Sequence, residues 1–261
     1  MVKRKSEKLG KTKTGNAKTG KTKTRNAKTG KAKTGNTKTG KNEKRENERE
    51  NEKTEGKRKN MILHIIRHGE TQWNQVKRLQ GQTDIPLTEA GRELARITGE
   101  RMKDIPIDLV FSSPLSRAVE TAQLITAGRD IPILTDRRII EISFGEWEGE
   151  SMLTSTVLPE TFKTMFYQDP LHCVCPPGGE TFRDVCDRTG AFYESLLQNP
   201  AYENSSILIS THGAAGRCLL TQFYEEKEDI WRGGVPANCA VSTVEIKNGV
   251  SKILYKDRIF Y

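Results

Sequence analysis

The chain has no apolar run long enough to cross a lipid bilayer, and no apolar stretch like that of a secretory signal peptide near its N-terminus. These absences exclude a transmembrane helix and argue against secretion. Cysteines are also few: there are five, and an odd number without a secretion signal favours free thiols in a reducing compartment. The sequence therefore predicts a cytoplasmic protein that does not bind a membrane.

Spacing typical of a metal site is missing as well. His172 is close to Cys173 and Cys175, but these residues have no matching pair of ligands elsewhere at the spacing of a zinc site. We therefore expect no metal and no other cofactor.

The charge is divided unevenly along the chain. Residues 1–60 hold 22 basic and 7 acidic side chains, a net charge of +15, whereas residues 61–261 hold 21 basic and 27 acidic side chains, a net charge of −6. The overall charge of +9 would suggest a nucleic-acid-binding protein. Because the excess lies entirely in the first 60 residues, it does not describe the rest of the chain.

Residues 11–40 are three copies of a ten-residue unit and contain no apolar residue larger than alanine. Stacked copies could not bury a core that offsets the entropy of ordering the backbone, so we predict a disordered basic tail over residues 1–60. Residues 15–22 fit the phosphate-binding pattern GxxxxGKT, but no buried strand or helix flanks them. We attribute that match to the repeated Lys, Thr and Gly.

Two other interpretations of the tail remain open. It could bind nucleic acid or another anionic surface nonspecifically through its charge. It could also result from the choice of start site, because Met61 opens a strand that needs nothing upstream.

Residues 61–261 are long enough for one domain with a sizeable hydrophobic core. Short apolar runs alternate with amphipathic segments, which predicts an α/β fold of three layers, α/β/α, with a mostly parallel sheet covered by helices on both faces. Thr88 and Ser113 are expected to cap helices, and Asn248-Gly249 to form a hairpin turn. The expected strands are 61–66, 109–111, 206–210, 241–246 and 252–255, and the expected helices are 89–102, 114–125, 181–198 and 214–224.

Polar residues follow three of these segments at the points where parallel strands would end at one edge of the sheet. Arg67 and His68 follow the first strand, Arg117 opens a helix after the second, and His212 follows a later strand. Glu141 lies in the segment between them. Phosphate transfer to an imidazole needs such a set: arginines hold the dianion, one neutral histidine attacks, another donates to the phosphoryl oxygens, and an acid protonates the leaving alkoxide.

Five motifs in the same order resemble those of the histidine phosphatase superfamily, in its phosphoglycerate-mutase-like branch, and especially the small phosphatases such as α-ribazole phosphatase and broad-specificity phosphatases. The first reads RHGETQWN, and the others are SSPLSRA, EISFGEWEG, PGGET and THG. The resemblance covers essentially all of residues 61–261. The motifs begin at Arg67, Ser112, Glu141, Pro177 and Thr211.

This resemblance implies the three-layer α/β fold of the phosphoglycerate mutases, with His68 as nucleophile and Glu141 as proton donor. It also implies that arginines supply the positive charge, so that no metal is needed. From the residues themselves, Phe162, Met165, Phe166 and Tyr167 are expected to pack as a cap over the site, and Arg183 and Arg188 to lie on solvated helix faces. The implied phosphate- and substrate-binding residues are Arg67, Asn74, Gln80, Gly81, Arg117, His212 and Gly213.

The leading interpretation is a phosphomonoesterase that acts on a small phosphorylated metabolite. A cofactor-dependent phosphoglycerate mutase would use the same residues, but the mutases usually have a longer segment before the last histidine motif. A third interpretation is a catalytically dead binding module with a nucleic-acid-binding tail. The intact set of arginines, histidines and Glu141 argues against it, and so does the acidic charge of residues 61–261.

Overall fold

The computed structural model describes residues 60–261. The predictions for the basic repeats, including their disorder, and for the phosphate-loop-like match at residues 15–22 lie outside the described residues. Within the described part, no helix has the length and apolar character needed to cross a bilayer.

The strands are β1 (Asn60–Arg67), β2 (Leu109–Ser112), β3 (Ile133–Thr135), β4 (Ser206–Thr211), β5 (Val241–Lys247) and β6 (Val250–Arg258). The helices are α2 (Gln72–Gln75), α3 (Glu89–Arg101), α4 (Ser116–Ile125), α5 (Glu160–Gln168), α6 (Phe182–Leu197) and α7 (Gly213–Leu220).

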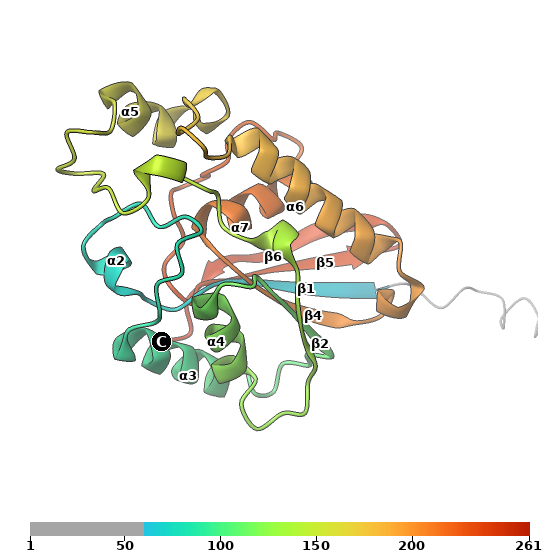
Figure 1. The fold of residues 1–261 in the computed structure, drawn as a ribbon. Helices are drawn as coiled ribbons and strands as arrows, with labels where there is room; N and C mark the ends of the chain where they lie inside the picture. Colours follow the sequence, from blue (N-terminus) through green and yellow to red (C-terminus); the bar gives the residue numbers. More distant parts are fainter. Residues whose placement is uncertain (1–59) are drawn as a thin grey trace, which may run out of the picture. The chain divides into compact units, whose positions relative to one another are not determined.

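The six strands form one mixed sheet in the order β3-β2-β4-β1-β5-β6. The four strands from β3 to β1 are parallel, and β5 and β6 are added as an antiparallel hairpin. Asn248 and Gly249 form the turn of this hairpin with φ values of 52° and 80°, a left-handed conformation that Asn and Gly tolerate best. Helices α3 and α4 lie on one side of the sheet and α6 and α7 on the other (Figure 1). The three-layer α/β/α prediction is confirmed.

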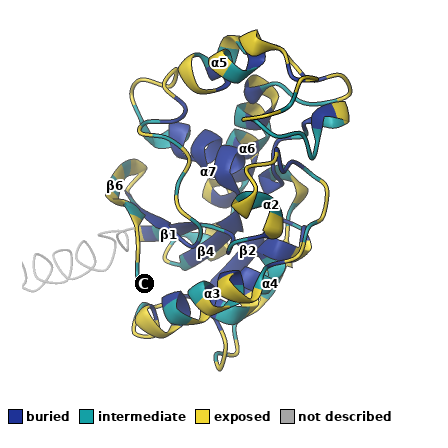
Figure 2. Cartoon of the chain, turned by 90° about the vertical axis from the view of Figure 1, so that its left-hand side faces the viewer, coloured by how far each residue is buried: buried dark blue, intermediate teal, exposed yellow. Residues whose placement is uncertain are grey.

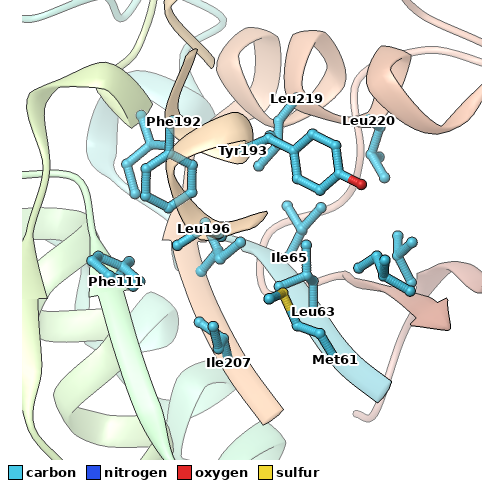
Figure 3. Close-up of a cluster of buried hydrophobic side chains, with 14 of the residues drawn as sticks. Met61, Leu63, Ile65, Phe111, Phe192, Tyr193, Leu196, Ile207, Leu219 and Leu220 are labelled. Atoms are coloured by element: carbon cyan, nitrogen blue, oxygen red, sulfur yellow. The ribbon is translucent and has the colours of Figure 1, made fainter. Parts of the chain in front are cut away.

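Alternating side chains of the strands build a core on each side of the sheet. Met61, Leu63 and Ile65 of β1 point toward α6 and α7, where they meet Phe192 and Leu219 (Figure 3). On the opposite face Ile66 and its neighbours Val110 and Leu208 pack against α3 and α4. The central strands are therefore buried on both faces, as Figure 2 shows in dark blue, which explains why their sequences are continuous apolar runs.

Two local predictions differ from the structure, and one short strand was not predicted. Ser113 does not cap a helix, because α4 begins at Ser116 after Leu115, and the Ser113 hydroxyl contacts His212 instead. The predicted helix 214–224 stops at Leu220 and continues as a short 3-10 turn. Strand β3 has only three residues, all at least partly exposed at the sheet edge, so it lacked the apolar run that marked the other strands.

Aromatic side chains form a separate cluster around α5, above α6 and α7 in Figure 1. Phe162 and Phe166 are buried in it, together with Phe144 and Trp231. Tyr167 differs from them because its side chain is half exposed, and it lines a cavity at the sheet edge together with Phe144, Phe166 and Trp231. The aromatic residues of α5 thus form the cap that the sequence predicted, with Tyr167 facing the cavity.

Candidate active site

A cavity of about 890 Å³ opens at the carboxyl edge of the parallel strands. Its position follows from the sheet register, because Arg67 at the end of β1 pairs with Thr211 at the end of β4. The backbone N–H of His68 also donates to the Thr211 carbonyl at 3.0 Å. Two polar segments 144 positions apart are thereby joined at the base of the cavity.

His68 is buried, and its Nδ1 lies 2.6 Å from the Gly69 carbonyl oxygen. Since a carbonyl can only accept, Nδ1 carries the proton and Nε2 keeps its lone pair. Burial lowers the pKa of His68 well below its usual range, and the positive charges of Arg117 and Arg67 lower it further. The ring is therefore neutral near pH 7 and has the form required of a nucleophile.

His212 lies beside it, with 5.1 Å between the two ring centroids and the rings in an edge-to-face arrangement. Its Nε2 is 2.7 Å from the Ser113 hydroxyl, whereas its Nδ1 is buried without a hydrogen-bond partner among the described residues. Burial, followed by the charge of Arg117 and the neighbouring His68, lowers its pKa as well. His212 is thus a second neutral imidazole with one free nitrogen.

Arg67 and Arg117 provide the positive charge of the site. Arg67 donates from Nη1 to the Pro236 carbonyl, and Arg117 donates from Nη1 to Thr83 at 2.9 Å and from Nη2 to Gly81 at 2.6 Å. The Nε atoms of both arginines are buried and have no partner among residues 60–261. Burial lowers the pKa of Arg117 to about 10, which still leaves it charged at neutral pH.

Glu141 is buried at the N-terminus of α7. Its carboxylate accepts hydrogen bonds from the backbone N–H groups of Gly213 (2.9 Å), Ala214 (3.2 Å) and Ala215 (2.9 Å), and of Ile142 (2.9 Å). The first three belong to the first turn of α7, where a helix leaves its N–H groups without internal partners, so the carboxylate occupies an anion-binding position. Glu141 and Gly213 both line the cavity.

Asn74 and Gln80 meet at the side of the cavity. The Gln80 Oε1 accepts from the Thr71 hydroxyl at 2.7 Å and from Asn74 Nδ2 at 3.2 Å, while its buried Nε2 has no partner in the described chain. Asn238 completes this network by donating to the His68 carbonyl at 3.0 Å and to Asn74 Oδ1 at 3.2 Å. No motif pointed to Asn238, because it lies in an irregular segment without a residue pattern of its own.

The remaining implied residues, Arg117, Gly81 and His212, do not line the cavity. Gly81 is packed closely: a Cβ there would lie 2.2 Å from Glu148 Oε1 and 2.8 Å from the Ile142 carbonyl. The structure therefore brings all nine predicted residues into one region but gives Gly81 a packing role beside Arg117.

Arg188 lies on α6, and its assignment to a solvated helix face is wrong. Its guanidinium donates to the carbonyls of Arg138 (2.8 Å), Ile140 (2.6 Å) and Glu141 (3.0 Å), and it forms an ion pair with Glu180 at 2.9 Å. Arg188 thus fixes the backbone that carries Glu141. The helical spacing alone could not reveal this, because its partners are about 50 positions away.

Metal-binding groups of three or more His, Cys, Asp or Glu side chains do not occur among residues 60–261. His172 instead pairs with Asp169 at 2.9 Å on the surface.

Comparison with known proteins points to one family. The sequence model of the histidine phosphatase superfamily (branch 1) matches residues 63–257. The protein named uncharacterized phosphatase PhoE of Bacillus subtilis is 37% identical over 158 residues, which make up 60% of this chain and 75% of the relative. The protein named probable phosphoglycerate mutase GpmB of Proteus mirabilis is 33% identical over 192 residues, 71% of this chain and 85% of the relative.

Solved structures give the same result. Bacillus stearothermophilus YhfR superimposes with a TM-score of 0.70 at 32% identity, covering 76% of this chain and 97% of that one. The α-ribazole phosphatase of Shigella flexneri superimposes with a TM-score of 0.66 at 27% identity, covering 76% of this chain and 96% of that one.

Proposed function

We propose, since the chain belongs to branch 1 of the histidine phosphatase superfamily, that it hydrolyses a small phosphorylated metabolite through a phosphohistidine on His68. One observation carries the proposal: His68 is neutral, its Nδ1 proton is held by the Gly69 carbonyl, and its Nε2 remains free. The charges of Arg67 and Arg117 act on His68, and the His212 ring lies 5.1 Å from it between centroids.

In the first half of the reaction, Nε2 of His68 attacks phosphorus and the bond to the leaving oxygen breaks. Glu141, in its protonated form, gives its proton to that oxygen and becomes a carboxylate. In the second half, a water molecule loses a proton to Glu141 and attacks the phosphohistidine, releasing phosphate and restoring His68. The guanidinium groups and the free nitrogen of His212 stabilise the charge on the phosphoryl oxygens.

The hydrogen bonds of Glu141 add a condition to this mechanism. A protonated carboxyl cannot accept from all of these N–H groups while donating to a leaving oxygen. Glu141 must therefore turn away from Gly213 and Ala214, whose N–H groups then become available to the phosphoryl oxygens. The N–H groups at the start of α7 thus bind the Glu141 carboxylate before the substrate arrives and the phosphoryl group afterwards.

The proposed reaction needs no metal ion, because the two arginines and the helix N-terminus supply the positive charge that a metal would otherwise contribute. Activity that survives EDTA supports this part of the proposal. Activity that is lost on chelation and restored by a divalent ion contradicts it.

Brief incubation with a radiolabelled phosphomonoester followed by rapid quenching tests the central step. The wild-type protein should retain acid-labile label, whereas His68→Ala should retain none and should hydrolyse nothing while keeping its thermal stability. His172→Ala is a matched control, because His172 is an exposed histidine outside the cavity. Label that persists in folded His68→Ala would refute the assignment.

The wild-type protein should also be assayed for isomerisation of 3-phosphoglycerate, because one relative is named as a probable phosphoglycerate mutase. Release of free phosphate without isomerisation favours the phosphatase. Isomerisation that outpaces phosphate release favours the mutase.

A further inference from the structure

The wall of the active-site cavity has a second pair of basic residues, separate from the arginines at its base. Lys77 and Arg78 follow the short helix α2 after its C-cap residue Val76, and they line the cavity with exposed side chains. Neither forms an ion pair within residues 60–261, and the recorded side-chain hydrogen bond is that of Arg78 Nη1 to the Gly149 carbonyl at 2.9 Å. Both positive charges are therefore available to a ligand.

The backbone around these two residues is held in place. The Lys77 carbonyl accepts from Met152 N at 3.3 Å, Arg78 forms an isolated bridge with Ser151, and Leu79 N donates to the Glu150 carbonyl at 2.8 Å. Figure 1 shows α2 lying between α3 and the cap helix α5. These contacts attach the Lys77–Leu79 backbone to the chain that leads into the cap, so both side chains start from a fixed backbone position at the cavity wall.

Lys77 also has φ of 55°, a left-handed conformation that is unfavourable for a residue with a long side chain. Such strain persists where surrounding contacts impose it, and it is often found at ligand sites. Here the backbone of Lys77 is held by its N–H bond to the Asn74 carbonyl, by Met152 N at its own carbonyl, and by the bridge of Arg78 with Ser151.

The carboxylates that line the same cavity, Glu70 and Glu141, form no ion pair with either cation in the described part of the chain. Glu141 is directed at the N–H groups of α7. Glu70 accepts from the Gln75 amide at 2.8 Å and from the Thr88 hydroxyl at 3.1 Å. The cavity, at about 890 Å³, is also in the range that holds a drug-sized ligand and much larger than a phosphoryl group requires.

We propose that Lys77 and Arg78 form a subsite for a second anionic group, a carboxylate or a second phosphate, on the organic part of the substrate. This inference rests on the proposed function, because the first phosphoryl group is placed at His68. It narrows the substrate class to phosphomonoesters that carry a further negative charge away from the scissile phosphate.

The subsite can be tested with substrates that differ by one charged group. Values of kcat/KM are measured for phenyl phosphate, 4-carboxyphenyl phosphate and 1,4-phenylene bisphosphate at physiological ionic strength, where the Debye length of about 8 Å screens distant charges. For the wild-type protein, the two substrates with the extra anion should be favoured over phenyl phosphate. Lys77→Gln should reduce that preference about three- to fivefold, the size of a solvent-accessible ion pair, and the double variant with Arg78→Gln should reduce it further.

The preference is the ratio of kcat/KM for a charged substrate to kcat/KM for phenyl phosphate. Comparing this ratio between variants cancels the electronic effect of the substituent on the leaving group. Lys103→Gln is the matched control, because Lys103 is a surface lysine just beyond the C-terminus of α3 that pairs with Glu100 and does not line the cavity. It should leave the preference unchanged. A preference that is the same in wild type and in the double variant, for both charged substrates, overturns the subsite.

Binding of phenylphosphonate and 4-carboxyphenylphosphonate, measured by calorimetry, separates this inference from the proposed reaction. If no substrate is turned over but the carboxylated phosphonate binds more tightly and loses this advantage in Lys77→Gln, the subsite stands and the phosphatase proposal fails. If phenyl phosphate is hydrolysed but neither assay shows the preference, the subsite alone fails.

Discussion

The hydroxyl of Ser113 lies 2.7 Å from Nε2 of His212, and the two residues are 99 positions apart in the chain. The same hydroxyl oxygen accepts from Leu115 N at 3.4 Å, so its own proton is directed at His212. A neutral imidazole that accepts at Nε2 carries its proton on Nδ1. Ser113 therefore keeps the proton of His212 on Nδ1. In the proposed mechanism, this Nδ1–H group donates to the phosphoryl oxygens.

Ser113→Ala should lower kcat about five- to tenfold, the effect of one lost hydrogen bond to a reacting group, while the protein stays folded. Ser113→Thr, which keeps the hydroxyl, should recover most of the loss. Ser112→Ala is the matched control, because Ser112 is equally buried and donates to the Ser113 carbonyl without contacting the site. Equal kcat values for Ser113→Ala and Ser112→Ala would show that the hydroxyl does not act through His212.

The stability of the protein should decrease on acidification, and His64 should account for part of the decrease. Burial lowers the pKa of His64 from 6.5 to about 4, and Thr243 is its hydrogen-bond partner at 3.1 Å. Between these two values the unfolded chain binds a proton that the folded protein does not, so stability is present above pH 6.5 and is lost as the pH falls. For this residue the loss from pH 8 to pH 5 is about 2 kcal/mol.

Urea unfolding at pH 8 and pH 5 measures this effect in the wild-type protein and in His64→Gln. The glutamine variant, which does not titrate, should lose less stability between the two pH values than the wild type. An identical loss in both proteins would mean that His64 is protonated in the folded state.

Glu141→Gln should distinguish substrates by their leaving groups. Hydrolysis of an alkyl phosphate, whose alkoxide needs protonation, should slow about 100-fold or more, and hydrolysis of p-nitrophenyl phosphate less than about tenfold. The side-chain amide of glutamine would also place its own N–H donors against the backbone N–H donors of Gly213 and Ala214, which should disturb the start of α7. That disturbance affects both substrates alike, so only the difference between them reports on proton donation. Equal losses would exclude Glu141 as the acid.

Removal of residues 2–59 should leave kcat and thermal stability nearly unchanged. The variant keeps Asn60, because β1 begins there and not at the predicted boundary of Met61. Strand β1 runs from Asn60 toward the cavity, so the deletion lies at the end of the strand opposite to His68. We expect a change in melting temperature within about 2 °C, since Val2 and Leu9 are the only apolar residues larger than alanine in the removed segment.

Any kinetic effect of the tail should appear in kcat/KM at low ionic strength, where its +15 charge can attract anionic substrates. It should fade at physiological salt. A shortened protein that fails to fold, or that has a lower kcat at physiological salt, would show that the tail contributes to the domain.

Several features of the fold and the candidate site could be predicted because they are local. A strand buried on both faces must be apolar along its length, so β1, β2 and β4 are visible as runs, and the polar residues after each run mark the sheet edge. That is enough to place Arg67, His68 and His212 together. Helix caps such as Thr88, whose side chain accepts from Gly91 N, are likewise short-range signals.

The tertiary structure alone decided which atoms in this site are engaged and which are free. Glu141 reaches the start of α7 across 72 positions, Asn238 reaches the His68 carbonyl across 170, and Arg188 holds the Glu141 backbone across 47. The Ser113 hydroxyl forms a hydrogen bond with His212 and does not cap the helix that follows it. Contacts of this kind depend on how separate elements pack, and a residue's type and near neighbours do not encode them. The sequence by itself therefore determined which motifs meet at the sheet edge, whereas only the fold determined the partners of their residues and added Asn238.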